Sequence, residues 1–176
     1  QGATVLFDTY KFEDSYDVCV ASPGISENSD FYHAAEAASA EVISEVEFAW
    51  RESAADSTWV AITGTNGKTT TTALAAHILN VCGKKAQAVG NIGDTCIDAV
   101  ASGAVDCYVA EVSSYQLAST KLFKPEVAVL LNITPDHPTY IAGHAMRTEK
   151  FKGVHDEIEA IMLGLQIDGK PFLWIE

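Results

Sequence analysis

The middle of the chain contains the stretch VAITGTNGKTT at residues 60–70, in which an apolar run is followed by a glycine-containing turn, Lys68 and two threonines. The apolar run predicts a buried β-strand at 58–63, and residues 68–81 predict an α-helix. A helix N-terminus has N–H groups without internal partners and a partial positive charge. A strand, a glycine turn and a helix in this order therefore predict a phosphate-binding loop.

This loop supplies the residues that we expect to bind ATP. Glycine lets the backbone approach phosphates closely, the Lys68 ammonium is expected to reach the β- and γ-phosphates, and the Thr69 hydroxyl to coordinate Mg²⁺. The segment departs from the usual G-x-x-x-x-G-K-[ST] pattern, because Ile62 stands where the first glycine should be. The alternative is a glycine turn that a lysine follows by chance. The predicted ATP contacts are Gly64, Thr65, Asn66, Gly67, Lys68, Thr69 and Thr70.

Short β-branched runs alternate with longer helical stretches along the rest of the chain. We predict strands at 18–21, 41–43, 58–63, 86–89, 106–112 and 126–132, and helices at 31–40, 46–52, 68–81 and 95–101. Residues 145–165 have helical periodicity in places, and residues 170–175 predict a terminal strand. Strands that alternate with helices indicate crossover connections. The predicted fold class is therefore α/β, with a parallel sheet and helices on both faces.

The composition is that of a globular protein with an excess of acidic residues. Hydrophobic residues make up 48% and charged residues 20%, and the formal net charge is −13. This charge argues against nucleic acid or an anionic membrane as a partner, whereas one phosphate site needs only local N–H groups and one cation. No apolar run approaches the roughly 20 residues of a membrane span, and the first residues lack a signal-peptide pattern. The chain has four cysteines, Cys19, Cys82, Cys96 and Cys107, and none of them has C-x-x-C spacing. We therefore predict that they are buried free thiols and that the protein is cytoplasmic.

Five segments together resemble the Mur ligase family, which includes the folylpolyglutamate synthetases. In the family's order they are ASPGI at 21–25, GTNGKT at 64–69, GNIG at 90–93, EVSSYQL at 111–117 and LNITPDH at 131–137. The first and third favour the members that add D-glutamate. The resemblance covers about residues 17–152. It implies part of an N-terminal, Rossmann-like UDP-substrate-binding domain at 1–57, followed by an incomplete central ATP-binding domain with the P-loop at 58–176.

The resemblance also implies a reaction. In this family ATP phosphorylates the carboxylate of a UDP-linked muramoyl precursor, and the amino group of the incoming amino acid, here D-glutamate, attacks the acyl phosphate. The step belongs to peptidoglycan precursor synthesis. Because phosphoryl transfer brings anions together, divalent cations must neutralise charge. The implied ligands are thus small molecules, ATP and Mg²⁺ or Mn²⁺; the sequence does not indicate an oligomeric state.

Metal ligands follow from the same resemblance. Glu111, at the end of a predicted strand, and His137, after the strand at 126–132, resemble ligands of the family. The family often adds a lysine carbamylated by CO₂, for which Lys150 is the predicted position and Lys152 the alternative. The predicted catalytic residues are Lys68, His137 and Lys150. The alternatives without a functional role are a solvated carboxylate at Glu111 and a structural histidine at His137.

Five further positions resemble substrate contacts of the family. Ser22, Pro23 and Gly24 resemble the turn near the substrate's diphosphate, and Asn91 and Ser113 resemble contacts to its carboxylate or phosphate region. The structural alternatives are an ordinary Pro-Gly turn, a turn-forming asparagine and a helix-capping serine.

The sequence also departs from the family. Within residues 1–176 we recognise no opening strand with a glycine-rich turn before Asp17 and no histidine-asparagine segment for adenine after Gly153. We also recognise no segment there that resembles the family's C-terminal amino-acid-binding domain. We therefore expect residues 1–176 to bind ATP phosphates and metal without completing the ligation alone. The alternatives are another Mur-type ligase or folylpolyglutamate synthetase, a P-loop kinase or NTPase, and a non-catalytic nucleotide-binding module.

Overall fold

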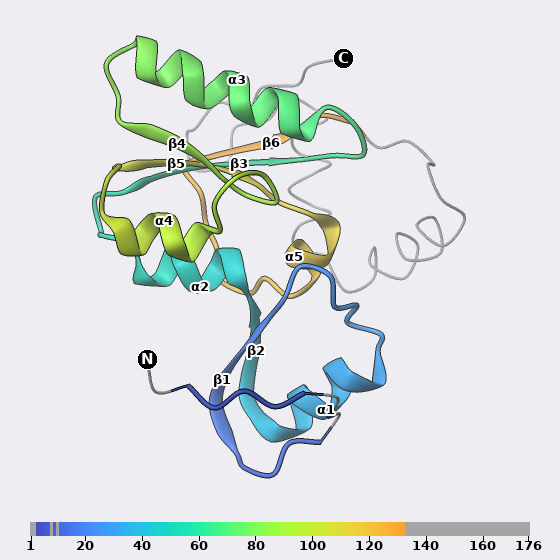
Figure 1. Cartoon of the computed structure of the whole chain (residues 1–176). Helices are drawn as coiled ribbons and strands as arrows, with labels where there is room; N and C mark the ends of the chain where they lie inside the picture. Colours follow the sequence, from blue (N-terminus) through green and yellow to red (C-terminus); the bar gives the residue numbers. More distant parts are fainter. Residues whose placement is uncertain (1–2, 8, 10, 133–176) are drawn as a thin grey trace.

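The structure is a computed structural model that describes residues 3–7, 9 and 11–132. A four-stranded sheet lies between helices, and a smaller two-stranded sheet with its own helix lies beside it (Figure 1). The helix predicted at 145–165 and the strand predicted at 170–175 lie outside the described residues.

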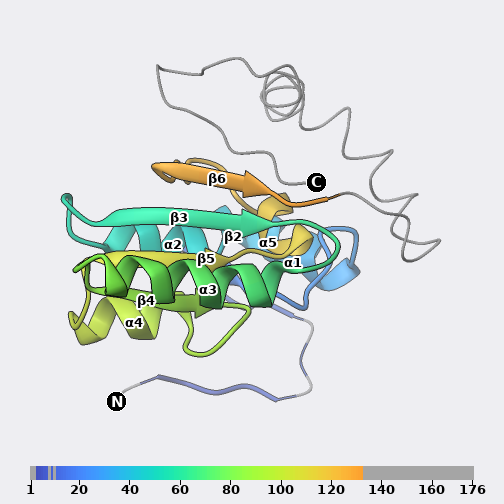
Figure 2. The same ribbon diagram turned by 90° about the horizontal axis from the view of Figure 1, so that it is seen from above.

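The larger sheet is parallel, with the strand order β4-β5-β3-β6. Its strands are β3 (Thr58–Thr63), β4 (Ala86–Gly90), β5 (Cys107–Glu111) and β6 (Val127–Leu130). Helix α3 (Lys68–Val81) covers one face, and α2 (Glu45–Glu52) and α4 (Cys96–Ser102) cover the other (Figures 1 and 2). The predicted α/β fold with helices on both faces is confirmed.

Two hydrophobic clusters fill the space on the two sides of this sheet. Ile62 and Val109 pack with Ala76 on the α3 side. On the other side the rings of Trp59 and Tyr108 stack with their centroids 4.7 Å apart, in a cluster shared with α2 and α4. Side chains of a strand alternate between the two faces. On β5 the odd-numbered residues, which include Glu111, therefore face α3.

The smaller sheet pairs β1 (Tyr16–Ala21) in parallel with β2 (Ser39–Ser44), and α1 (Asp30–Ala38) packs on it. The helix predicted at 31–40 is wrong at its C-terminal end, because residues 39 and 40 belong to β2. Ser39 pairs with Tyr16 of β1. The alanine-rich run favours a helix, but strand pairing outweighs this local preference.

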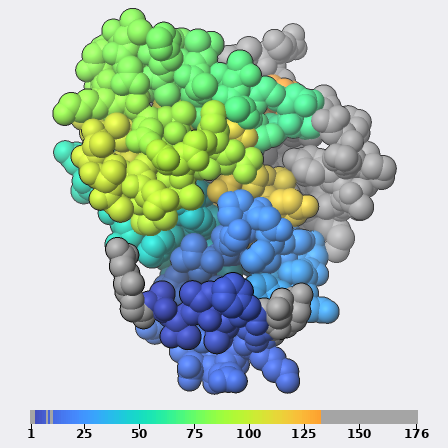
Figure 3. Space-filling view, viewed as in Figure 1, coloured from blue at the N-terminus to red at the C-terminus, as the bar shows by residue number. Residues whose placement is uncertain are grey.

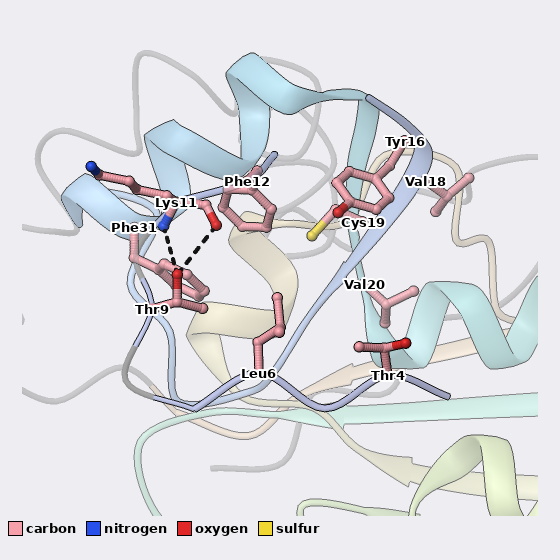
Figure 4. Close-up of a pocket in the computed structure, with 10 residues that line it drawn as sticks. All are labelled: Thr4, Leu6, Thr9, Lys11, Phe12, Tyr16, Val18, Cys19, Val20 and Phe31. Atoms are coloured by element: carbon pink, nitrogen blue, oxygen red, sulfur yellow. Dashed lines mark hydrogen bonds between the residues drawn. The ribbon is translucent and has the colours of Figure 1, made fainter. Parts of the chain in front are cut away.

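The N-terminal residues 3–7 run along the smaller sheet and form one wall of an open pocket of about 360 Å³. Leu6, Phe12 and Phe31 contribute much of its lining (Figure 4). In the space-filling view the dark-blue atoms of the N-terminal residues lie beside the other blue residues and away from the green α3 (Figure 3). None of the predicted site residues lines this pocket.

Helix α5 (Ser114–Ala118) was not predicted. It follows β5 and connects through residues 119–126 to β6. A reciprocal capping box starts it: the Ser113 hydroxyl accepts from the Gln116 N–H at 3.2 Å, and the Gln116 side chain accepts from the Ser113 N–H at 2.9 Å. The S-x-x-Q spacing was the available sequence indication.

The cysteines differ in exposure. Cys96 and Cys107 are buried, Cys19 is half-buried and Cys82 is exposed, so the expectation of four buried thiols is wrong at Cys82. Cys82 comes directly after the last residue of α3, where the chain turns back toward β4. Among the described residues, no helix has the length and apolar character needed to cross a bilayer.

Candidate functional site

The predicted phosphate loop, residues 64–69, connects the end of β3 to the start of α3. Both of its glycines have positive φ, 142° at Gly64 and 83° at Gly67, where side chains cause strain. A Cβ at Gly64 would also lie 3.1 Å from the backbone N and O of Asn132. The loop conformation therefore depends on glycine at 64 and 67.

The first turn of α3 has no side-chain cap. Gly67 occupies the N-cap position and offers no side-chain acceptor. The first backbone bond into the helix runs from the Thr71 N–H to the Gly67 carbonyl, at 3.0 Å. Across the described part of the chain, the N–H groups of residues 67–70 have no acceptor. Four N–H donors at the positive end of a 14-residue helix are suited to an anion.

The Lys68 side chain folds over the loop. Its Nζ donates to the carbonyl oxygens of Gly64, at 2.8 Å, and Thr65, at 3.0 Å. An ammonium group has three N–H donors, so one remains after these two bonds. The hydroxyl-bearing residues Thr69 and Thr70 follow on the exposed surface. The loop thus combines a cation, N–H donors and hydroxyls.

Asn132 is a loop contact that the sequence analysis missed. It follows β6, and its side chain exchanges two hydrogen bonds with the backbone of Asn66, each 2.9 Å long. Its own carbonyl accepts from the Thr65 N–H at 3.0 Å. Asn132 lies inside the LNITPDH segment, but no local pattern pairs it with a residue 66 positions earlier.

Glu111 ends β5, beside β3, where it pairs in register with Ile62. Its side chain is 3% exposed and lies on the α3 face of the sheet. Oε1 accepts from Asn91 Nδ2 at 3.4 Å, and Oε2 has no hydrogen-bond partner among the described residues. A buried carboxylate oxygen without a partner is costly. This oxygen fits a hard cation such as Mg²⁺, which prefers oxygen ligands.

Asn91 follows β4 and is bound to Glu111 twice, since its backbone N–H also donates to the Glu111 carbonyl at 3.1 Å. The preceding Gly90 has φ 93°, and a Cβ there would lie 2.6 Å from the same carbonyl oxygen. The Gly-Asn segment therefore brings an amide side chain to the predicted metal ligand. Its contact with substrate stays a prediction.

Ser113 and the turn at Ser22, Pro23 and Gly24 have structural roles in this structure. The Ser113 hydroxyl caps α5. The turn follows β1 and is closed by a bond from the Ile25 N–H to the Ser22 carbonyl, at 3.0 Å. These are the structural alternatives that the sequence offered. Their substrate contacts stay predictions.

The remaining predicted ligands, His137, Lys150 and the alternative Lys152, lie outside the described residues. Within residues 3–7, 9 and 11–132, no cluster of three or more His, Cys, Asp and Glu side chains could hold a metal ion. Glu111 is thus the predicted carboxylate ligand that the described part contains.

Comparison with known proteins identifies the family. Residues 62–149 match the model of the Mur ligase middle domain. The chain belongs to the Mur ligase family. The matched segment of this Mur ligase chain includes the loop, Asn91, Glu111, Asn132 and His137, and it ends one residue before Lys150.

Curated Mur ligases resemble the chain over most of its length. It is 46% identical over 128 residues to the UDP-N-acetylmuramoylalanine–D-glutamate ligase of Thermoanaerobacter sp. (strain X514). The aligned residues are 72% of this chain and 28% of that protein. Identity to the ligase of the same name from Geobacter metallireducens is 49% over 122 residues, or 69% of this chain and 26% of that protein. The Mur ligase chain thus spans about a quarter of the length of these relatives.

Among solved structures, one of UDP-N-acetylmuramoyl-L-alanyl-D-glutamate–2,6-diaminopimelate ligase gives a TM-score of 0.43 at 21% identity, over 71% of this Mur ligase chain and 35% of that chain.

Proposed function

We propose that this chain contributes the ATP- and metal-binding core of a ligase that adds D-glutamate to UDP-N-acetylmuramoyl-L-alanine. The reaction would use ATP, proceed through an acyl phosphate and serve peptidoglycan precursor synthesis. The proposal is supported by the identity of 46–49% to ligases with this activity in their names. It is carried by one structural observation: Glu111, with its unpartnered oxygen, lies on the sheet face covered by the helix that begins with Lys68.

The loop residues would bind the triphosphate of ATP. Four N–H groups that have no acceptor among the described residues would donate to the phosphate oxygens, and the Lys68 ammonium would offset the charge of the β- and γ-phosphates. Together they would hold the phosphates in a fixed orientation. The γ-phosphoryl group then moves to a carboxylate oxygen of the UDP-linked substrate, and ADP leaves. The nitrogen of D-glutamate attacks the carbonyl carbon, the phosphate leaves with its bonding electron pair, and the nitrogen loses a proton.

Divalent metal would be held by Thr69, Glu111 and His137, with a carbamylated Lys150 as a further ligand. A bound Mg²⁺ or Mn²⁺ supplies positive charge where phosphoryl oxygens and a carboxylate must approach each other. Glu111 fits this role because its buried oxygen accepts no hydrogen bond in the described residues. Asn91, bound to the same carboxylate, would then reach the substrate carboxylate or phosphate region.

The remaining parts of the proposal concern organisation. We assign residues 1–57 to a partial UDP-substrate-binding domain, with Ser22, Pro23 and Gly24 near the diphosphate, and residues 58–176 to the ATP-binding domain. Helix α2 precedes this boundary but packs on the larger sheet, so it would join the two parts. The partners would be small molecules, with neither nucleic acid nor membrane, and the location the cytoplasm, where ATP and UDP-linked precursors are found.

Thermal unfolding of the full protein tests the proposal. Mg-ATP and UDP-N-acetylmuramoyl-L-alanine should each raise the melting temperature, because each binds the native state. A kinase or NTPase would respond to Mg-ATP and ignore the UDP compound. The Lys68→Ala variant should lose the Mg-ATP response and keep the other. Phosphate release should require D-glutamate, and we expect none from residues 1–176 alone; turnover by residues 1–176 would contradict that expectation.

A further inference from the structure

The side chain of Asn132 faces the backbone in the middle of the phosphate loop. Its Oδ1 accepts from the Asn66 N–H, and its Nδ2 donates to the Asn66 carbonyl, both at 2.9 Å. The Asn132 carbonyl accepts from the Thr65 N–H at 3.0 Å. One residue after β6 therefore makes three hydrogen bonds to two consecutive residues of the loop.

These bonds determine which donors of the loop are left for a ligand. They occupy the N–H groups of Thr65 and Asn66, and the N–H groups without a described acceptor begin at the next residue, Gly67. Since a peptide unit is planar, fixing the N–H and C=O of Asn66 fixes the peptide planes on both sides of it. The orientation of the Gly67 N–H then follows from the position of Asn132.

From this geometry we infer that Asn132 is a positioning residue for ATP, which acts through the loop without touching the nucleotide. The inference rests on the proposed function, because it requires that the loop binds ATP phosphates. Asn132 holds the loop so that the N–H groups from Gly67 onward point away from the protein's own acceptors. A preorganised donor set binds its ligand more tightly than one that must be ordered on binding.

Two residues, Lys68 and Asn132, hold the loop backbone through different groups. The Lys68 ammonium binds the carbonyls of Gly64 and Thr65, while Asn132 binds the Thr65 N–H and the backbone N–H and carbonyl of Asn66. The backbone of Asn132 also lies where a Cβ of residue 64 would be, 3.1 Å away. Loss of the Asn132 side chain would therefore remove two hydrogen bonds to the Asn66 backbone and loosen the carbonyls that orient Lys68.

Substitution of Asn132 tests the inference. Asn132→Asp keeps the size and one acceptor but places an oxygen against the Asn66 carbonyl, and Asn132→Ala removes both bonds. We expect either variant to raise the Kd for Mg-ATP about tenfold, which corresponds to the loss of one or two hydrogen bonds. The Kd for adenosine, which has no phosphate, should not change. In turnover, the KM for ATP should rise while the KM for the UDP-linked precursor stays the same.

Asn80→Asp is the matched control at the other end of α3. The Asn80 amide likewise binds backbone on both sides, donating to Ala76 and Ala86 and accepting from Ala86 at 3.0 Å. This variant should lower the melting temperature without changing the Kd for Mg-ATP. Titration calorimetry on the full protein measures each Kd. The inference fails if Asn132→Asp binds Mg-ATP as tightly as the wild type, or if Asn80→Asp weakens binding equally. A wild-type protein that does not bind Mg-ATP would overturn the proposed function, and the inference with it.

Discussion

Replacement of Glu47 by alanine should destabilise the protein more than any change to a surface ion pair. Glu47 of α2 has no exposed surface, and its carboxylate accepts bonds from Arg51 and from the N–H groups of Lys121 and Leu122. The bond to Leu122 is 3.0 Å long and spans 75 residues of sequence. This carboxylate therefore fixes the segment after α5 to α2, under the larger sheet.

The size of the effect follows from the partners that the variant would leave behind. Removing one partner of a buried ion pair costs about 3–5 kcal/mol, because the other polar groups stay buried without it. Here Arg51 keeps Glu41, which it binds through two nitrogens at 2.6 and 3.2 Å. Lys121 and Leu122 are exposed, so water can reach their N–H groups. We therefore expect Glu47→Ala to lose about 3 kcal/mol, the lower end of the range.

Urea unfolding of the wild type, Glu47→Ala and Glu41→Ala measures this loss, with equal m-values as the check that the unfolded states are comparable. Glu41→Ala is the control, because Glu41 binds the same arginine from a solvent-accessible position. It should lose much less stability than Glu47→Ala. The reasoning is refuted if the Glu47 variant loses less than about 1 kcal/mol, the value of an exposed pair, or if the two variants lose the same amount.

Three other perturbations have defined outcomes. Gly64→Ala should lower the free energy of unfolding by about 1–3 kcal/mol, because a side chain at this positive φ causes strain, and it should bind Mg-ATP more weakly. Gly24→Ala is the control: its Cβ would meet no atom within 4 Å, so urea unfolding and titration calorimetry should show wild-type stability and affinity. Burial raises the pKa of the Glu45 carboxyl above 4.5, so the stability that this group contributes is present below pH 4.5 and is lost as pH rises through the higher pKa of the folded state. The melting temperature of Glu45→Gln should therefore rise relative to that of the wild type as pH increases from 4 to 8. Parallel curves for the two proteins would contradict this. Glu111→Gln keeps the shape of the side chain and removes its buried charge, so the metal-free melting temperature should not fall. The Mg²⁺-dependent affinity for ATP should fall at least about tenfold; equal binding with and without EDTA in both proteins would argue against a metal role.

The sequence predicted those helices and strands whose ends are determined by neighbouring residues in the sequence. β3 and α3 were predicted at their observed bounds, Thr58–Thr63 and Lys68–Val81, because a β-branched run ends at a glycine turn there. The prediction was wrong at residues 39 and 40, where pairing with β1 outweighs helix propensity. Helix α5 was missed because five residues are too few to establish a 3.6-residue period.

The site divides in the same way. The places of Lys68 at the start of α3 and of Glu111 at the end of β5 could be predicted, because each is fixed by its own helix or strand. Their roles stay predictions. Asn132 could not be predicted as a loop contact, since its partners depend on which strand lies beside β3. The same holds for the bonds from Glu47 to the N–H groups of Lys121 and Leu122, which are 74 and 75 residues away. Hydrophobic periodicity carries no information about such pairs.

The strand order explains why the loop lies between Glu111 and Asn132. β3, which leads into the loop, has β5 on one side and β6 on the other. Glu111 ends β5 and Asn132 follows β6, so the predicted metal ligand and the residue that holds the loop approach it from opposite neighbours. Because the connection through α3 takes the chain from β3 to β4, past β5, the position next to β3 is left for β5 and Glu111. Were β4 to pair directly with β3, Gly90 would lie beside Ile62 in place of Glu111, and the Glu111 carboxylate would no longer end the strand next to the loop.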